Sequence, residues 1–158
     1  NRLRAFNQLM INILQNSNRT STYTSLLNLL ATSHDKPNMK KYTELVVKCL
    51  LKLTKALEST VDRIQIDILL MDLHEFLTAN PPTQFKNKDD LPLRTVKTIL
   101  NELVKVKGPS IRTHLSFIPT HKNPLIVSYI ELMLTNAQRQ RERAQESHHH
   151  QDPGAIPS

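Results

Sequence analysis

The sequence predicts an all-α protein built from antiparallel helix pairs. Apolar residues recur at helical spacing along most of the 158 residues. The chain has two glycines, Gly108 and Gly154, whereas β-hairpins and phosphate-binding loops depend on glycine where the backbone turns left-handed. Aromatic residues make up 4% of the sequence, so we expect a core of Leu, Ile and Val side chains.

The first half of the chain contains four expected helices. The apolar stripes place them at residues 2–15, 20–32, 39–57 and 61–79. The polar segment NSNRTS separates the first two, and Pro37 lies just before the third. We expect Ser59 or Thr60 to cap the fourth helix. Its apolar residues lie on more than one side, which predicts that it is sandwiched between neighbours.

The second half opens after the segment NPPTQFKNKDD, whose paired prolines cannot continue a helix. The stretch LPLRTVKTILNELVKVKGP, residues 91–109, carries both a start and a stop signal for the next helix. Asp89 or Asp90 is expected to cap it, Pro92 occupies its first turn, and Gly108 with the following proline ends it.

Two further helices are expected, a short one over residues 110–118 and a last one over residues 123–138. The remainder has no apolar stripe. We therefore predict a folded domain over residues 1–138 and a fraying, then disordered, polar tail over residues 139–158.

Short connections predict that the helices form antiparallel pairs: 2–15 with 20–32, 39–57 with 61–79, and 93–106 with 110–138. Each pair spans about 30–45 residues, the period of HEAT-type solenoid repeats. Sequence similarity between the pairs is weak, so a helical bundle is the alternative. We favour a shortened HEAT-like α-solenoid.

Motifs of catalysis and cofactor binding are missing. The sequence contains no GxxxxGK, GxGxxG or HExxH. The acids of residues 61–79 lie along one helix, which is typical of a solvated face, and the tract His148–His150 lies in the polar tail. No apolar run reaches the ~20 residues of a membrane span. We expect no enzyme activity, no cofactor, no metal and no membrane partner.

Basic residues follow two helical stripes. One consists of Lys41, Lys48, Lys52 and Lys55, and the other of Arg94, Lys97 and Lys105 with Asn101 between them, in a chain of net charge +7. Glu102 is the only acid within residues 91–109. Each stripe is either a solvated helix surface or a docking surface for an acidic partner. We do not expect nucleic acid, because aromatic stacking residues and a bare recognition helix are missing.

Three segments carry a family resemblance: TELVVKCLLKL, IQIDILLMDLHEFL and LPLRTVKTILNELVKVKGPSIRTHLSFI. In this order and spacing, over residues 40–118, they resemble the C-terminal region of the ch-TOG/Minispindles family of microtubule polymerases, its fly member most closely. The resemblance implies a cryptic sixth TOG domain, a shortened HEAT-repeat array. It also implies a family that binds tubulin, promotes microtubule growth, and reaches spindle poles and centrosomes through TACC-family coiled coils.

The resemblance and the basic stripes together predict a non-catalytic adaptor domain of a cytoplasmic, cytoskeletal protein at the centrosome and spindle pole. Its partner would be a TACC-type coiled coil. The expected contact residues are Arg94, Lys97, Lys105, Lys107, Arg112, Lys48, Lys52 and Lys55. The alternatives are direct, weak binding of tubulin or microtubules through the same basic face, and a spacer that only packs against neighbouring domains.

Overall fold

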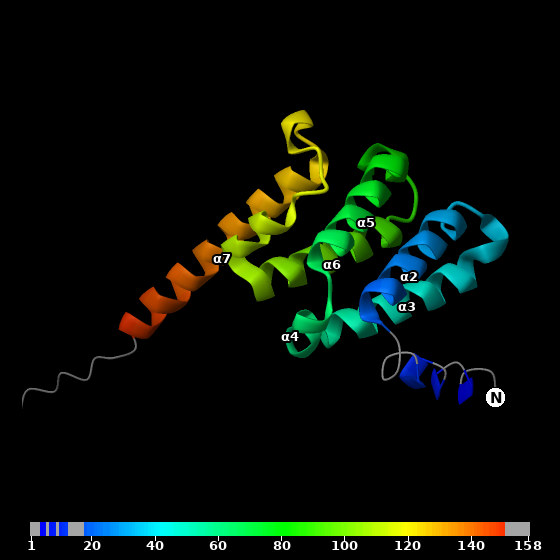
Figure 1. Cartoon of the computed structure of the whole chain (residues 1–158), viewed down its shortest axis with the longest axis horizontal. Helices are drawn as coiled ribbons and strands as arrows, with labels where there is room; N and C mark the ends of the chain where they lie inside the picture. The colour runs from blue at the N-terminus through cyan, green and yellow to red at the C-terminus, as the bar shows by residue number, and fades with distance from the viewer. Residues whose placement is uncertain (1–3, 6, 9, 13–17, 151–158) are drawn as a thin grey trace, which may run out of the picture.

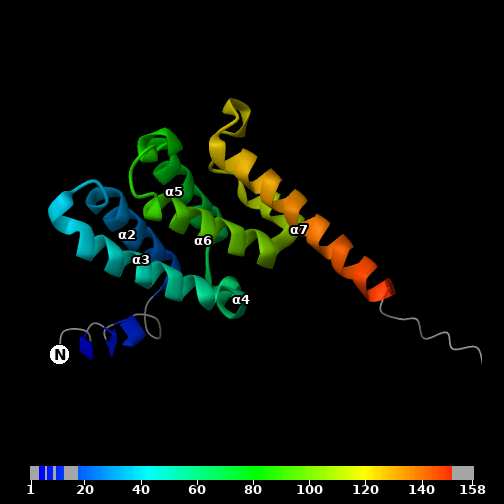
Figure 2. The ribbon, with the colours of Figure 1, turned by 180° about the vertical axis from the view of Figure 1, so that it is seen from behind.

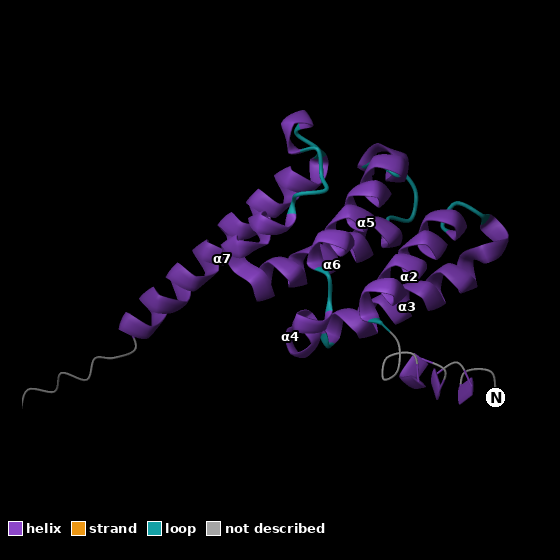
Figure 3. Ribbon diagram, in the orientation of Figure 1, coloured by secondary structure: helices purple, strands orange, loops and turns teal. Residues whose placement is uncertain are grey.

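The structure is a computed structural model that describes residues 4–5, 7–8, 10–12 and 18–150. These residues contain no strand (Figure 3), which confirms the all-α class. The helices are α2 (Arg19–Ser33), α3 (Lys40–Lys55), α4 (Leu57–Thr60), α5 (Ile66–Ala79), α6 (Leu91–Lys107) and α7 (Leu125–His150). Short 3₁₀ helices connect them: η1 (Pro37–Met39), η2 (Val61–Arg63), η3 (Pro82–Phe85), η4 (Gly108–His114) and η5 (Thr120–Lys122). Residues 4–5, 7–8 and 10–12 are also helical.

The helices stack side by side in two layers. In the first layer α2 packs against α5 and α5 packs against α7, while in the second α3 packs against α6. In Figure 1 the stack runs from α2 and α3 on the right, through α5 and α6, to α7 on the left, and Figure 2 shows it from behind. This arrangement is the predicted short α-solenoid of stacked helices.

The pairing of helices in the first half differs from the prediction. The main neighbour of α3 is α2, not α5, and α5 packs chiefly against α2 and α7. The connections explain this: residues 34–39 are a short turn that returns the chain beside α2, whereas α4 and η2 separate α3 from α5. The predicted pairing of residues 2–15 lies largely outside the described residues. The third pair is confirmed, because α6 packs against both η4 and α7.

Helix α5 is buried on several sides, as its apolar pattern predicts. It contacts α2, α6, η4 and α7. Leu69, Leu70 and Leu73 are fully buried, and the surrounding core consists almost entirely of aliphatic side chains. Burying one such side chain contributes about 1.5–3 kcal/mol.

The start of α5 lies later than predicted. The helix begins at Ile66, because the hydroxyls of Ser59 and Thr60 donate to the carbonyl of Ala56, at 3.0 and 2.7 Å, and cap nothing downstream. The N-cap residue is Gln65, whose backbone N–H donates to Oγ1 of Thr20 on α2 at 2.9 Å. A hydroxyl of the neighbouring helix thus holds the first residue of this boundary, and the side chain of Gln65 makes no cap hydrogen bond.

The ends of α6 follow the sequence signals closely. Asp90 is the N-cap residue, but Asp89 supplies the cap hydrogen bond, accepting from the N–H of Leu91 at 3.0 Å. Pro92 lies in the first turn as predicted. Gly108 ends the helix with φ of 59°, a region that L-amino acids with side chains avoid. The following segment differs from the prediction: residues 108–114 form 3₁₀ helix and α-helix resumes only at residue 125.

Helix α7 is longer than predicted. It continues through His150, so residues 139–150 are helical where the sequence predicts a fraying and disordered tail. Gln, Arg, Glu and Ala propagate a helix well once the packed residues 125–137 have nucleated it, even without an apolar stripe. The amide of Gln138 donates to Glu142 one turn later, at 3.2 Å. Residues 151–158 lie outside the described residues, and the division of the chain into domain and tail stays a prediction.

A buried polar contact joins α2 to α3. The hydroxyl of Thr54 donates to the carbonyl of Leu50 at 2.7 Å, so its oxygen accepts from the hydroxyl of Tyr23 at 3.1 Å. Tyr23 is fully buried, and this burial raises its pKa from 10.0 to about 12. The native state therefore retains the phenolic proton more strongly than the unfolded chain does.

Tyr23→Phe is expected to reduce the stability of the fold at neutral pH by about 1 kcal/mol, the usual contribution of a buried hydrogen bond. Between pH 10 and 12 the unfolded tyrosine loses its proton while the native one keeps it, so wild-type stability should fall as the pH rises through this window. The contribution of Tyr23 to that fall should be about 3 kcal/mol and absent from the variant. Urea unfolding at several pH values measures both, and parallel pH profiles would contradict the assignment.

Candidate protein-interaction surface

The first group of predicted contact residues lies on α6. Arg94, in its first turn, forms ion pairs with Asp90 at 2.8 Å and Asp89 at 3.8 Å. Its side chain remains 61% exposed. An exposed pair of this kind contributes little to stability, but it lowers the net positive charge that Arg94 presents.

The middle of α6 faces α7. Nζ of Lys97 lies 5.0 Å from the centroid of the Tyr129 ring on α7, a cation–π contact. Lys97 is half-buried as a result. The sequence predicts this lysine as a contact residue on a basic stripe, whereas the structure gives it an intramolecular partner.

Arg112, in η4, also contacts α7. Its Nε and Nη2 donate to the two carboxylate oxygens of Glu131, both at 2.8 Å, in a two-point ion pair. These hydrogen bonds lower the pKa of Glu131 and raise that of Arg112. The pair fastens η4 to α7 at the protein surface.

The last turn of α6 contains Lys105 and Lys107. Lys105 donates to Glu102 at 3.1 Å, one turn earlier on the same helix. Lys107 forms no ion pair with any residue that the structure describes. Of the five predicted residues in α6 and η4, Lys107 is therefore the cation left without an acidic or aromatic partner in the described chain.

Sequence reasoning missed most of this charge compensation. Within residues 91–109 it counted Glu102 alone, but three further acids lie just outside that window or far along the chain. Asp90 precedes Arg94 by four residues, a helical ion-pair spacing that could have revealed the contact. Glu131 is nineteen residues from Arg112 and gives no comparable signal.

The second group of predicted residues lies on α3. Lys48, Lys52 and Lys55 are exposed and form no ion pair with any residue in the described ranges. They lie along one side of the helix, and α3 packs against α6. The structure thus brings the two helices together, while it leaves the lysines of α3 uncompensated and most cations of α6 compensated.

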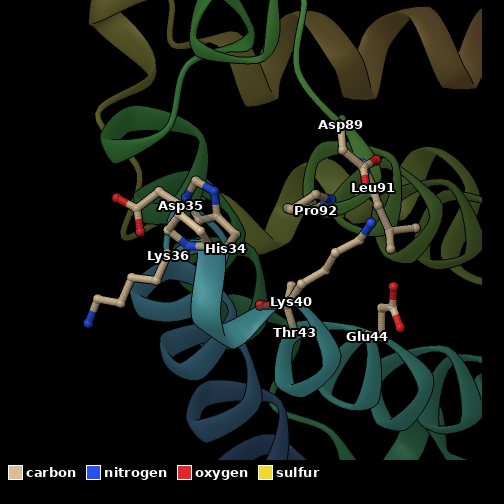
Figure 4. Close-up of a pocket in the computed structure, with 10 residues that line it drawn as sticks. His34, Asp35, Lys36, Lys40, Thr43, Glu44, Asp89, Leu91 and Pro92 are labelled. Carbon is tan, nitrogen blue, oxygen red and sulfur yellow. The ribbon is translucent and has the colours of Figure 1, made fainter.

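A hollow of about 370 Å³ opens between the turn after α2 and the start of α6 (Figure 4). Lys40 extends across it towards Leu91 and Pro92, as Figure 4 shows. The lining carries both signs of charge, with two lysines and three acids: Lys36, Lys40, Asp35, Glu44 and Asp89. Such a mixed lining favours no single class of ligand.

A polar cluster that the sequence did not reveal joins α5 to the end of η4 and the residues that follow it. Asp67 accepts hydrogen bonds from Nδ1 of His114 and from the hydroxyl of Ser116, the latter at 3.1 Å. The contact with His114 is the main cause of the lowered pKa of Asp67. Ser116 donates to the carboxylate and not to the imidazole, so this cluster lacks the serine–histidine hydrogen bond of a hydrolytic triad.

Other reactive or ligand-binding groups are sparse in the described residues. Cys49 is half-buried, and burial raises the pKa of its thiol, which favours the unreactive protonated form. No three His, Cys, Asp or Glu side chains are grouped as metal ligands in the described part of the chain. Among the described helices, none has the length and apolar character to cross a membrane.

Replacing Arg112 with Ala should raise the pKa of Glu131, since the hydrogen bonds from the guanidinium are the main cause of its lowered value. A pH titration of the Glu131 side-chain carboxyl signal by NMR measures the change. Lys122→Ala, which removes an exposed cation outside this contact, should leave the Glu131 titration unchanged. An identical Glu131 pKa in wild type and Arg112→Ala would show that the two-point pair does not persist in solution.

The chain is similar to several known proteins. It is 40% identical to Protein MOR1 of Oryza sativa subsp. japonica and to Protein MOR1 of Arabidopsis thaliana, over 84% of its own length in both cases. It is 32% identical to Protein mini spindles of Drosophila melanogaster over 86% of its length. The two plant proteins are thus more similar to it than the fly protein, so the expected closest likeness to the fly member is wrong. No protein-family model and no solved structure matches the chain.

These alignments cover most of this chain but only 7–8% of each relative. They include all the helices whose segments carried the resemblance noted in the sequence. Identity of 32–40% over more than four-fifths of the chain is sustained similarity along most of its length. The chain belongs to the ch-TOG/Minispindles family, aligning with a short segment of its much longer members.

Proposed function

We propose that this chain is the cryptic sixth TOG domain of a microtubule polymerase and acts there as a non-catalytic adaptor. In this role it helps to localise the polymerase to centrosomes and spindle poles by binding a TACC-family coiled coil. Family membership supports a microtubule-related role. Relatives named mini spindles and Centrosomal protein 224, the latter from Dictyostelium discoideum and 31% identical, support a place in the cytoskeleton at the spindle and centrosome.

The observation that carries the proposal is the row of uncompensated lysines on α3. Lys48, Lys52 and Lys55 project from one packed helix, spaced over about 10 Å at 1.5 Å per residue. A coiled coil presents its acidic side chains at the same helical spacing, so a rigid row of cations can match them in register. None of the three lysines forms an ion pair in the described part of the chain, so their charges are available to a partner.

The cations of α6 and η4 have a different role in the proposal. Arg94, Lys105 and Arg112 each hold an acid of the same chain, so a partner carboxylate must compete with it. Lys107 has no acid in the described part of the chain that a partner carboxylate would have to displace. We therefore assign the main electrostatic attraction to α3 and Lys107, and orientation of the partner to the paired cations of α6 and η4.

Reversing the charges on α3, as K48E/K52E/K55E, should weaken pull-down of the chain by a TACC coiled coil about tenfold or more. Reversing R94E/K97E/K105E should also weaken it, but less, because Arg94 and Lys105 are already compensated. The matched control is K86E/K88E/K122E, three exposed lysines outside both stripes with the same change in net charge. Circular dichroism should show unchanged helix content in all three. Equal loss of TACC binding in the control, or no loss in either test variant, would contradict the assignment of these residues as partner contacts.

The same α3 lysines favour a second candidate function, direct but weak binding of microtubules. The acidic, extended tails of tubulin require exposed positive charge more than a shaped pocket. In this case the isolated chain should pellet with microtubules at low salt, and pelleting should disappear with K48E/K52E/K55E or after the tubulin tails are removed by protease. Retention of binding to tail-less microtubules would exclude a tail-based mechanism.

A further inference from the structure

A groove lies between the end of α6 and the middle of α7. It encloses about 690 Å³ where α7 runs past the last turn of α6 (Figure 1). From α6 and η4 it is lined by Lys105, Val106, Lys107, Gly108 and Pro109. From α7 it is lined by Ala137, Gln140, Arg141 and Ala144. None of the α7 residues was among the contact residues predicted from the sequence.

Every charged residue of the lining is a cation. The lining contains the three cations Lys105, Lys107 and Arg141 and no acid. Lys105 holds Glu102, but Lys107 and Arg141 form no ion pair within the described chain. Three positive charges around one hollow are complementary to carboxylates.

The end of α6 does not account for these charges by itself. Cations near a helix C-terminus stabilise its unpaired carbonyls, which would explain the lysines of α6. Yet two of these carbonyls already accept hydrogen bonds from the chain itself. The N–H of Gly108 donates to the carbonyl of Val104, and the hydroxyl of Ser110 donates to the carbonyl of Lys107 at 2.6 Å. Arg141 belongs to another helix altogether. The positive groove is therefore more than a helix-end effect.

The shape of the groove favours a helical occupant. The four α7 residues that line it follow one another at i, i+3, i+4 and i+7, a straight stripe along two helical turns. Ala137 and Ala144, one heptad apart, are short enough to let another helix approach closely. Val106 and Pro109 add apolar surface on the opposite wall.

We infer that this groove binds an acidic amphipathic helix of a partner protein, with carboxylates at Lys105, Lys107 and Arg141 and an apolar edge over the two alanines. The inference rests on the proposed adaptor function and narrows it, by adding a docking site on α7. A protein helix fits better than nucleic acid, because the lining offers an apolar floor and no aromatic side chain on which a base could stack.

The test uses the whole chain and a synthetic helical peptide of about four turns, with Glu along one face and Leu and Ala along the next. Fluorescence anisotropy gives the affinity, and amide chemical shifts map the site. We expect shifts concentrated at residues 105–109 and 137–144. The double variant K107E/R141E should lose about tenfold or more in affinity. The milder K107Q/R141Q, which keeps good helix formers at both positions, should lose several-fold.

The matched control is K122E/R143E. Arg143 is exposed on α7 and does not line the groove, and the pair makes the same change in net charge. Its affinity for the peptide should equal that of wild type. A peptide with Gln in place of Glu should bind far more weakly.

Four results would overturn the inference: equal binding of the Gln peptide, equal loss in the control variant, shifts confined to other helices, or equally tight binding of a single-stranded oligonucleotide at the same amides. Loss of TACC pull-down on reversal of the α3 lysines, with no peptide bound at the groove, would overturn the groove and leave the adaptor function intact. Peptide binding at the groove without any TACC pull-down would overturn the adaptor function and leave the groove as a binding site.

Discussion

The structure depends on the burial of α5 on several faces at once. Leu69, Leu70 and Leu73 are fully covered by neighbours in both layers, and no other helix contacts α2, α6 and α7 together among the main packing contacts in the described residues. With side chains worth about 1.5–3 kcal/mol each when buried, this helix contributes strongly to the stability of the stack. Its position also places α6 and α7, and thus the charges that they present, relative to α3.

The helices themselves were predictable because they are local. Stripes of Leu, Ile and Val identified the cores of α2, α3, α5 and α6, and Pro92 and Gly108 marked the ends of α6 to within a residue. The neighbours were not predictable in the same way. Periodicity reports which face of a helix is buried and not what covers it, so the partner of α3 had to come from the structure. The N–H of Gln65 at the start of α5, which donates to the Thr20 hydroxyl on another helix, illustrates the same limit.

The candidate surface was also predictable only in part: the exposure of its cations could be predicted, but their pairing with acids could not. That the cations lie on exposed helix faces followed from their spacing, and Arg94, Lys105 and the lysines of α3 are indeed exposed. Their electrostatic state did not follow, because it depends on acids brought close by the fold. Glu131 compensates Arg112 across two elements, while Lys52 forms no ion pair with any residue that the structure describes. A basic stripe in a sequence therefore gives only the number and spacing of the charges. The electrostatic potential at the surface also depends on which acids the fold brings close to them.

Lys105 links the paired and unpaired regions of this surface. It lines the groove beside α7 and also holds Glu102 on α6. Because both members of that pair are substantially exposed, breaking it costs little, and Lys105 can exchange Glu102 for an incoming carboxylate at small expense. Glu102, once released, faces solvent and would repel an acid placed on the wrong side of α6. An exchangeable pair beside unpaired cations therefore selects the register of an acidic helix as well as attracting it, which a uniformly positive surface cannot do.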